Sequence, residues 1–228
     1  MSESTGEVKK KVKLISLKLA VVIGLFLLTL FLFLRIADEV VLEHENAFDD
    51  RVFKLIAGYT SPFATRIMLF FTFFGSTYFQ FPAWILLTAY YLFIKHKTRV
   101  SINIAAIGLS SFILLFALKG LFKRARPMDP LIEKVKHFSF PSGHSFSGFT
   151  FFGVVIYIIW QTKIQKIWKW ILSVTAFLFA CMIAFSRVYL HVHFITDIIA
   201  GFCLSVVWLS LSFIIFQWID RKTILSSK

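Results

Sequence analysis

Three short clusters of polar residues hold the side chains of this sequence that could do chemistry. The first contains two cations, Lys119 and Arg126, and ends in a proline. The second, at residues 141–144, reads Pro-Ser-Gly-His, and the third, at residues 186–197, reads Ser-Arg-x5-His-x3-Asp. Cations and backbone N–H groups bind oxyanions, while histidine can transfer a proton or attack an electrophile. We therefore interpret the clusters as parts of a site that binds an anion and acts on it.

The first cluster places its two outer cations seven residues apart. If a helix continues through this segment, Lys119 and Arg126 share one face, and Pro127 predicts that the helix ends at Arg126. Two cations held together attract a phosphate, and arginine can grip two of its oxygens at once. The two cations between them, Lys123 and Arg124, are interpreted as residues that extend to the interface beside lipid headgroups.

The second cluster lies directly before a long apolar run, where a helix is expected to enter a membrane. Free N–H groups at a helix start bind anions, and Gly143 lets an oxyanion come close to them. Ser142 can cap the helix and also donate its hydroxyl, although a plain cap is the more common role. His144 falls in the first turn, where an imidazole can protonate a leaving oxygen or can be an ordinary polar residue at the interface.

The third cluster contains a histidine–aspartate pair. His193 and Asp197 are four residues apart, so they can share one helical face. An aspartate that accepts from one imidazole nitrogen leaves the other nitrogen free to attack an electrophile. An isolated pair would be an ordinary surface hydrogen bond, but neighbouring ionisable groups at a membrane edge favour a functional role. Arg187 adds a positive charge, whereas His191 has no acidic partner at the same spacing and is left out of the catalytic set.

The composition predicts that the elements holding these clusters lie in a membrane. Of the 228 residues, 58% are hydrophobic, 16% are charged and 29 are Phe. Soluble domains are nearer ~45–50% apolar and ~25% charged, so a soluble enzyme, a disordered tail and a coiled coil are excluded. The net charge of +13 comes from short clusters between apolar runs, which indicates topology signals rather than a nucleic-acid partner. Cys181 and Cys203 fall inside apolar runs, which favours small buried side chains over a disulfide.

Six apolar runs are present, and a spanning helix needs about 20 residues. We therefore predict an all-α fold, a polytopic membrane helix bundle with six transmembrane helices, formed by residues 1–228 as a single domain. Residues 38–76, between the first two runs, are predicted to form short interfacial helices in the first outside loop. The runs cover residues 14–34, 79–94, 100–118, 145–160, 170–185 and 198–219.

The distribution of Lys and Arg predicts the orientation. With both termini in the cytoplasm, the basic segments 9–13, 95–99, 163–169 and 221–228 all lie inside. The second outside loop is the exception, because residues 119–136 hold six cations against two carboxylates. These cations need a reason other than topology. The same topology brings all three polar clusters to the non-cytoplasmic surface.

Together the three clusters resemble the three-part signature of the type-2 phosphatidic acid phosphatase superfamily. All three parts occur in order and with matching spacing over residues 119–197, and the six-span layout resembles the bacterial membrane lipid phosphatases over most of the chain. The matching residues are Lys119-x6-Arg126-Pro127, Pro141-Ser142-Gly143-His144 and Ser186-Arg187-x5-His193-x3-Asp197.

The resemblance implies a role for each matching residue. His193 is expected to be the nucleophile that forms a phosphohistidine, and Asp197 is expected to orient it and stabilise its charge. His144 is expected to protonate the leaving oxygen and then to help activate water. The residues implied in binding the phosphate oxygens are Lys119, Arg126, Ser142, Gly143 and Arg187. The family mechanism needs no metal and no other cofactor, since the cations supply the positive charge.

The resemblance therefore implies a metal-independent lipid phosphatase that acts on a phosphomonoester or diphosphate. Undecaprenyl diphosphate, phosphatidylglycerophosphate and phosphatidic acid are the expected substrates, and a lipid A phosphatase or a phosphotransferase of the same family is the alternative. The expected location is the bacterial cytoplasmic (inner) membrane, with the active site on the periplasmic or extracellular side. The expected partners are the lipid substrate and the bilayer, without an obligate protein partner.

Two other classes of protein remain open from the residues alone. His144, His191, His193 and Asp197 could be ligands of a metal enzyme, and an extended segment would allow both His191 and His193 to bind. A membrane transporter is the other alternative, because intramembrane charge often marks a pathway. The clustering of the charges at one face, with no acidic residue in the middle of a span, argues against transport.

Overall fold

The computed structural model describes residues 2–43, 46–133 and 138–226, and all regular structure in these ranges is helical, as the sequence predicts. Three lysines counted in the charge analysis lie outside the described residues: Lys134 and Lys136 of the second outside loop, and Lys228 of the last basic segment. The helices are α1 (Ser2–Ala37), α2 (Ala47–Ala57), α3 (Pro62–Gly75), α4 (Thr77–Ala89), α5 (Thr98–Phe122), α6 (Gly143–Gln161), α7 (Lys166–Tyr189) and α8 (Ile195–Ser226), and the π-helical turns η1 (Asp38–Leu42) and η2 (Tyr90–Ile94) continue α1 and α4.

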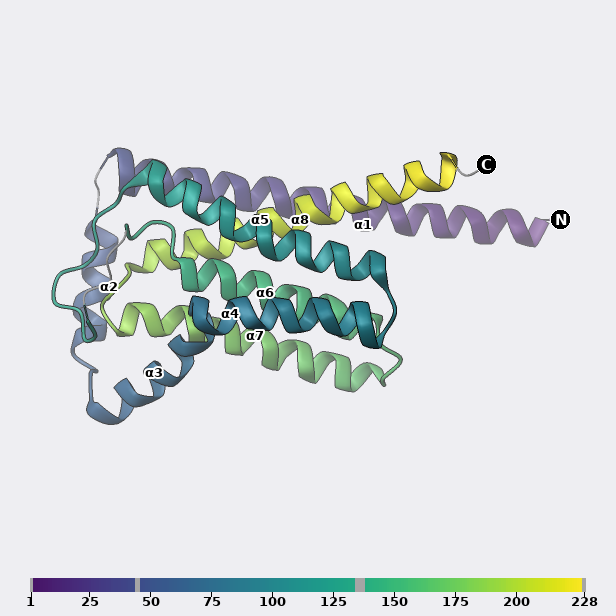
Figure 1. Cartoon of the computed structure of the whole chain (residues 1–228). Helices are drawn as coiled ribbons and strands as arrows, with labels where there is room; N and C mark the ends of the chain where they lie inside the picture. The colour runs from purple at the N-terminus through teal and green to yellow at the C-terminus, as the bar shows by residue number, and fades with distance from the viewer. Residues whose placement is uncertain (1, 44–45, 134–137, 227–228) are drawn as a thin grey trace.

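The long helices form a bundle whose two ends differ (Figure 1). α1 packs along α8, α6 packs against α7 and α8, and α4 packs along α5. α2 lies across one end of the bundle with α3 beside it, while the first turn of α1 and the last turn of α8 lie at the opposite end (Figure 1). α5 and α7 finish at the α2 end, and α6 and α8 begin there (Figure 1). This alternation brings the three polar clusters to the α2 end.

Five helical segments are long and apolar enough to cross a membrane. They cover Leu19–Val41, Thr98–Phe122, Gly143–Gln161, Lys166–Tyr189 and Ile195–Ile219. The one predicted span not among these five, residues 79–94, is divided between α4 and η2, so no single α-helix covers it. Large apolar side chains on the outer faces of α1, α4 and α5, such as Leu28, Leu86 and Phe116, are more than half exposed. A surface of this kind is stable in lipid rather than in water.

The predicted short helices of residues 38–76 are present as α2 and α3. Ser61 caps α3, and its backbone N–H donates to the Tyr189 hydroxyl at 2.9 Å. Phe74 of α3 contacts Phe179 of α7 edge to face, with ring centroids 5.0 Å apart. These contacts hold the first loop against the end of α7, next to the third polar cluster.

The start of α6 is packed closely against α8. A Cβ atom added at Gly201 of α8 would lie 2.9 Å from the carbonyl oxygen of Ser142 and 2.9 Å from the side chain of Ser145. The Ser145 hydroxyl donates to the carbonyl oxygen of Ile198 at 2.8 Å. Small residues let two membrane helices approach in this way. The close approach fixes the second polar cluster relative to the third.

Candidate active site

A cavity of about 410 Å³ lies at the α2 end of the bundle, among α3, α4, α5 and α6. Six of the eight residues predicted to form the site line it: Lys119, Arg126, Gly143, His144, Arg187 and His193. The other two, Ser142 and Asp197, are fully buried behind its wall. The structure therefore brings all three sequence clusters to one place, although they are separated by up to 78 positions between Lys119 and Asp197.

His193 is held by hydrogen bonds at both ring nitrogens. Its Nδ1 lies 3.1 Å from Oδ2 of Asp197, and its Nε2 lies 3.1 Å from Nη1 of Arg126. Because a carboxylate only accepts, Nδ1 carries the proton and Nε2 presents its lone pair. Burial lowers the pKa of His193 to about 3, with Arg126 and Lys119 acting in the same direction and Asp197 opposing them. The ring is therefore neutral at physiological pH.

The prediction that His193 and Asp197 share a helical face is wrong in one respect. α8 begins at Ile195, so His193 lies in the turn before the helix. The pair still forms, because the N–H of Phe194 donates to Oδ2 of Asp197 at 3.0 Å and folds the turn back over the first turn of α8. The contact therefore depends on a capping turn rather than on helical spacing.

Asp197 is 0% exposed and accepts from four donors. Oδ2 receives the His193 ring, the Phe194 N–H and the Ser139 hydroxyl, and Oδ1 receives Nη1 of Arg124 at 2.7 Å. A buried carboxylate is stable only with partners of this kind. Ser139 was not predicted from the sequence. The only available signal is its place three residues before the Ser142 cap.

The predicted helix through the first cluster is shorter than expected. α5 ends at Phe122, because Lys123 adopts a left-handed conformation with φ of 48°. Lys119 and Arg126 nevertheless meet, since Nζ of Lys119 and Nη2 of Arg126 donate to the carbonyl oxygen of Phe138 at 2.7 and 3.3 Å. Burial lowers the pKa of Arg126, and Asp197 opposes this effect. A shared backbone acceptor therefore replaces the predicted shared helix face.

Arg187, at the end of α7, is 4% exposed and reaches the cavity from the side of α3. Its Nη1 donates to the hydroxyl of Thr72 at 2.5 Å. Thr72 lies outside the three clusters and was not predicted. The contact shows that α3, part of the first loop, positions one of the site's cations.

The second cluster forms the predicted helix start. Ser142 caps α6, with its hydroxyl accepting from the Ser145 N–H at 3.4 Å, and His144 lies in the first turn facing the cavity. Ser142 is fully buried, and its role in binding phosphate stays a prediction. Gly75 at the end of α3 packs on His144, since a Cβ atom there would lie 2.7 Å from Cδ2 of the ring. The position of the imidazole thus depends on a glycine in the first loop.

Arg124 corrects the sequence interpretation most clearly. It was assigned to the interface beside lipid headgroups, but it is 8% exposed and forms ion pairs with Asp49 and Asp197 at 2.6 and 2.7 Å. Lys123 beside it is exposed, which agrees with its assignment. The sequence offers no local signal for this difference, because both partners of Arg124 are more than 70 residues away.

His191 does not join the site. Its ring packs on Phe53 of α2, with centroids 4.4 Å apart, and its Nδ1 lies 3.3 Å from the carbonyl oxygen of Asp129. It does not line the cavity that holds His144 and His193. Within the part of the chain that the structure describes, no three His, Cys, Asp or Glu side chains are grouped to hold a metal ion.

The cavity extends from the cations along α5. There it is lined by Phe112, Leu115 and Phe116. A neighbouring apolar cavity of about 290 Å³, between α4 and α5, shares Phe112 as a lining residue and reaches Ala105. From Lys119 to Ala105 is fourteen residues, or ~21 Å along a helix. A charged pocket and an apolar groove are therefore adjacent.

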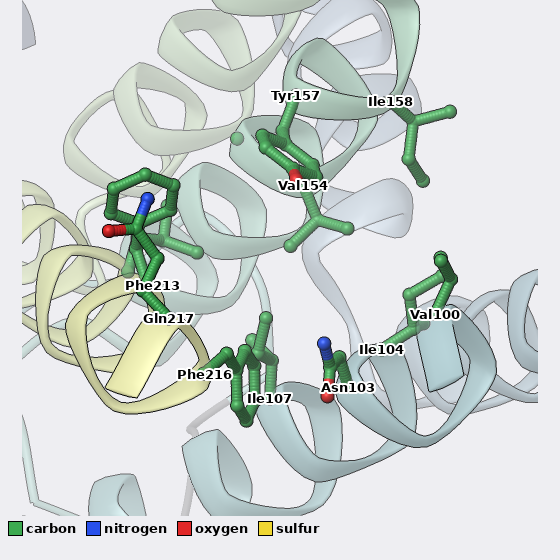
Figure 2. Close-up of a pocket in the computed structure, with 12 residues that line it drawn as sticks. Val100, Asn103, Ile104, Ile107, Val154, Tyr157, Ile158, Phe213, Phe216 and Gln217 are labelled. Atoms are coloured by element: carbon green, nitrogen blue, oxygen red, sulfur yellow. The ribbon is translucent and has the colours of Figure 1, made fainter. Parts of the chain in front are cut away.

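A third cavity lies at the other end of the bundle. Figure 2 shows it between α5, α6 and α8, with Tyr157, Asn103 and Gln217 among mostly apolar side chains. Its volume is about 370 Å³, and none of the residues that line it is Asp, Glu, Lys, Arg or His. It therefore holds no side chain that is charged at neutral pH, unlike the cavity at the α2 end.

Comparisons with known proteins identify similar chains. The model of the PAP2 superfamily matches residues 99–221. Phosphatidylglycerophosphatase B of Bacillus subtilis is 29% identical over 85% of this chain and 94% of its own length, and an undecaprenyl-diphosphatase of Sulfolobus acidocaldarius is 31% identical over 81% and 86%.

Solved structures are similar as well. The crystal structure of the transmembrane PAP2-type phosphatidylglycerolphosphate phosphatase of Bacillus subtilis superposes with a TM-score of 0.73 at 28% identity and covers 88% of this chain and 96% of that one. The structure of LpxE of Aquifex aeolicus gives a TM-score of 0.55 at 28% identity, with 73% and 95% covered.

Proposed function

This chain belongs to the PAP2 superfamily and is a phosphatase, and on that premise we propose that it hydrolyses the phosphate ester or diphosphate of a membrane lipid through a phosphohistidine. One observation carries the proposal. The unprotonated Nε2 of His193 belongs to the same cavity as His144 and three cations, and its Nδ1 is held by Asp197. A neutral, oriented imidazole beside cations is suited to attack phosphorus.

The reaction has two balanced steps. In the first, Nε2 of His193 attacks phosphorus, the bond from phosphorus to the leaving oxygen breaks, and His144, which takes up a proton when the anionic phosphate binds beside it, gives that proton to the leaving oxygen. In the second, neutral His144 takes a proton from water, the water oxygen attacks phosphorus, and the phosphorus–nitrogen bond breaks. Asp197 stabilises the positive charge of the phosphorylated ring. Lys119, Arg126 and Arg187, with the N–H groups at the start of α6, balance the charge on the phosphoryl oxygens.

The apolar groove supports a lipid as the substrate. A headgroup phosphate at Lys119 would leave its acyl or prenyl chain at Phe112 and Ala105, between α4 and α5. The relatives named phosphatidylglycerophosphatase and undecaprenyl-diphosphatase support the same class. We propose phosphatidylglycerophosphate, undecaprenyl diphosphate or phosphatidic acid as the substrate, with a lipid A phosphate as the alternative.

The proposed orientation follows from charge. We propose six crossings, with α4 and η2 together forming the second, and with both termini in the cytoplasm. The basic residues 95–99 and 163–169 then lie inside, and the cavity at the α2 end opens to the outside. This places the reaction at the outer interface of a bacterial cytoplasmic membrane, where the headgroup meets the cations.

The test is phosphate release by the purified protein in detergent, over a panel of these lipid phosphates and with chelator present. The wild type is expected to turn over at least one of them, and His193→Ala is expected to abolish release while keeping the wild-type elution profile and melting temperature. His191→Ala, whose ring lies outside the cavity, is the matched control and is expected to stay within ~threefold of wild type. Turnover by His193→Ala at the wild-type rate would remove the nucleophile assignment.

A further inference from the structure

A buried arginine outside the cavity links the first loop to the proposed nucleophile. Arg124 lies two residues after α5 ends, and its guanidinium is enclosed by two carboxylates. Nη1 donates to Oδ1 of Asp197 at 2.7 Å, and Nη2 donates to Oδ2 of Asp49 at 2.6 Å and to Oδ1 of Asn46 at 2.6 Å. The face of the guanidinium lies 4.3 Å from the ring centroid of Phe194. Contacts on its edges and its face leave this group one position.

Asp49 of α2 binds the first turn of α8 as well. Its Oδ1 accepts from the backbone N–H of Thr196 at 3.0 Å, and its Oδ2 accepts from the Thr196 hydroxyl at 2.5 Å. Asp49 is 2% exposed. A carboxylate at a helix start accepts from the free N–H groups and is stabilised by the helix dipole. Asp49 therefore holds both Arg124 and the residue directly before Asp197.

We propose that Arg124 and Asp49 are positioning residues of the hydrolytic reaction, acting through Asp197 on the ring of His193. The inference rests on the proposed function. Arg124 is the cation in direct ion-pair contact with the buried Asp197 carboxylate, and it fixes Oδ1 so that Oδ2 faces Nδ1 of the imidazole. Neither Arg124 nor Asp49 lines the cavity, so neither touches the substrate. Replacing either residue should therefore change the reactivity of the His193 ring rather than the binding of the substrate.

The first loop thereby becomes part of the proposed catalytic machinery. A lysine in place of Arg124 keeps the charge but loses the planar fork that reaches both carboxylates. An asparagine in place of Asp49 keeps an acceptor for Thr196 but removes the charge that faces Arg124. Asp49→Asn leaves Asp197 paired with Arg124, and Arg124→Lys keeps one cation beside the two carboxylates, so both changes disturb the geometry without removing the buried cation.

The experiment measures kcat and KM for phosphate release by Arg124→Lys, Asp49→Asn and the double variant. Each single variant is expected to lower kcat by ~10-fold or more with KM within ~twofold, the pattern of a group that acts only in the chemical step. The double variant is expected to lose less than the product of the two single losses, because both act through one carboxylate. The matched controls are Lys123→Gln and Asp50→Asn, exposed neighbours that should retain wild-type kcat.

A second readout follows the ring of His193 directly. The ¹⁵N signals of its nitrogens, assigned by their absence from His193→Gln, are expected to shift in Arg124→Lys and Asp49→Asn and to stay unchanged in the two controls. Wild-type kcat and unshifted signals in both variants would overturn the inference. A KM that rises with unchanged kcat would overturn it as well, since that pattern indicates substrate binding. If the wild type releases no phosphate from any lipid, the proposed function fails, and the ¹⁵N signals then decide the positioning role alone.

Discussion

Replacing Asp197 by asparagine removes one charge from the proposed site and almost no volume. Three donors converge on Oδ2 and one cation faces Oδ1, so the amide oxygen should take the Oδ2 position. The amide NH2 group then meets Nη1 of Arg124, a donor against a donor. His193 keeps an acceptor for its Nδ1 proton but loses the negative charge that balances the phosphorylated ring.

The size of the loss follows from the geometry. Nδ1 of His193 and Oδ2 of Asp197 are 3.1 Å apart, and the charge centres of the ring and the carboxylate are slightly farther apart. Two unit charges at ~4 Å interact by ~4 kcal/mol at an effective dielectric constant of ~20. Since ~1.4 kcal/mol corresponds to a tenfold change in rate, Asp197→Asn is expected to lower kcat by ~10³-fold.

The assay combines phosphate release with trapping of the phosphoenzyme. Asp197→Asn should form the phosphohistidine slowly, so the phosphoenzyme trapped after rapid mixing with labelled lipid phosphate should stay well below the wild-type level. Asp50→Asn, an exposed carboxylate of α2, is the control for loss of one negative charge at this end of the protein. A kcat within ~threefold of wild type, at an unchanged melting temperature, would refute the electrostatic role of Asp197.

Two further predictions concern the histidines. Because burial lowers the pKa of His193 to about 3, its ring should stay neutral as the pH falls from 8 to 4.5. In the unfolded chain a histidine binds a proton below about pH 6.5. His193 therefore lowers the free energy of unfolding as the pH falls from there to 4.5. A ¹⁵N ring signal that titrates near the ordinary value would contradict the burial argument. Gly75→Ala should lower kcat ~10-fold or more and reduce the melting temperature, because its Cβ would meet the His144 ring at 2.7 Å and a crowded core costs ~1–3 kcal/mol. Gly24→Ala, with no heavy atom within 4 Å, is the control, and equal behaviour of the two variants would show that the crowding is harmless.

Much of the fold was predictable because membrane helices carry a local signal. An apolar run long enough to cross a bilayer is visible in the sequence, and so is the cap of α6 at Ser142. The division of residues 79–94 between α4 and η2 was not predicted, since a change from α to π hydrogen bonding leaves composition and hydropathy unchanged. The end of α5 at Phe122 was also missed, because the left-handed conformation of Lys123 has no signature comparable to the proline four residues after it.

The residues of the predicted site could be named in advance because their types and spacing fall within three short segments. Alternating helices at one end of a bundle then bring the segments together, whatever the details of the packing. What the sequence determined by itself is therefore the inventory of charged and nucleophilic groups and the end of the molecule at which they meet.

The support of those groups was decided only by the tertiary structure. Arg124 and Asp197 are separated by 73 positions, and Asp49 and Thr196 by 147. Contacts over such separations leave no periodicity or spacing in the chain, and an exposed Lys123 and a buried Arg124 look alike in the sequence. Burial turns one of these neighbouring cations into the partner of the Asp197 carboxylate, because a charge removed from water must find an opposite charge nearby.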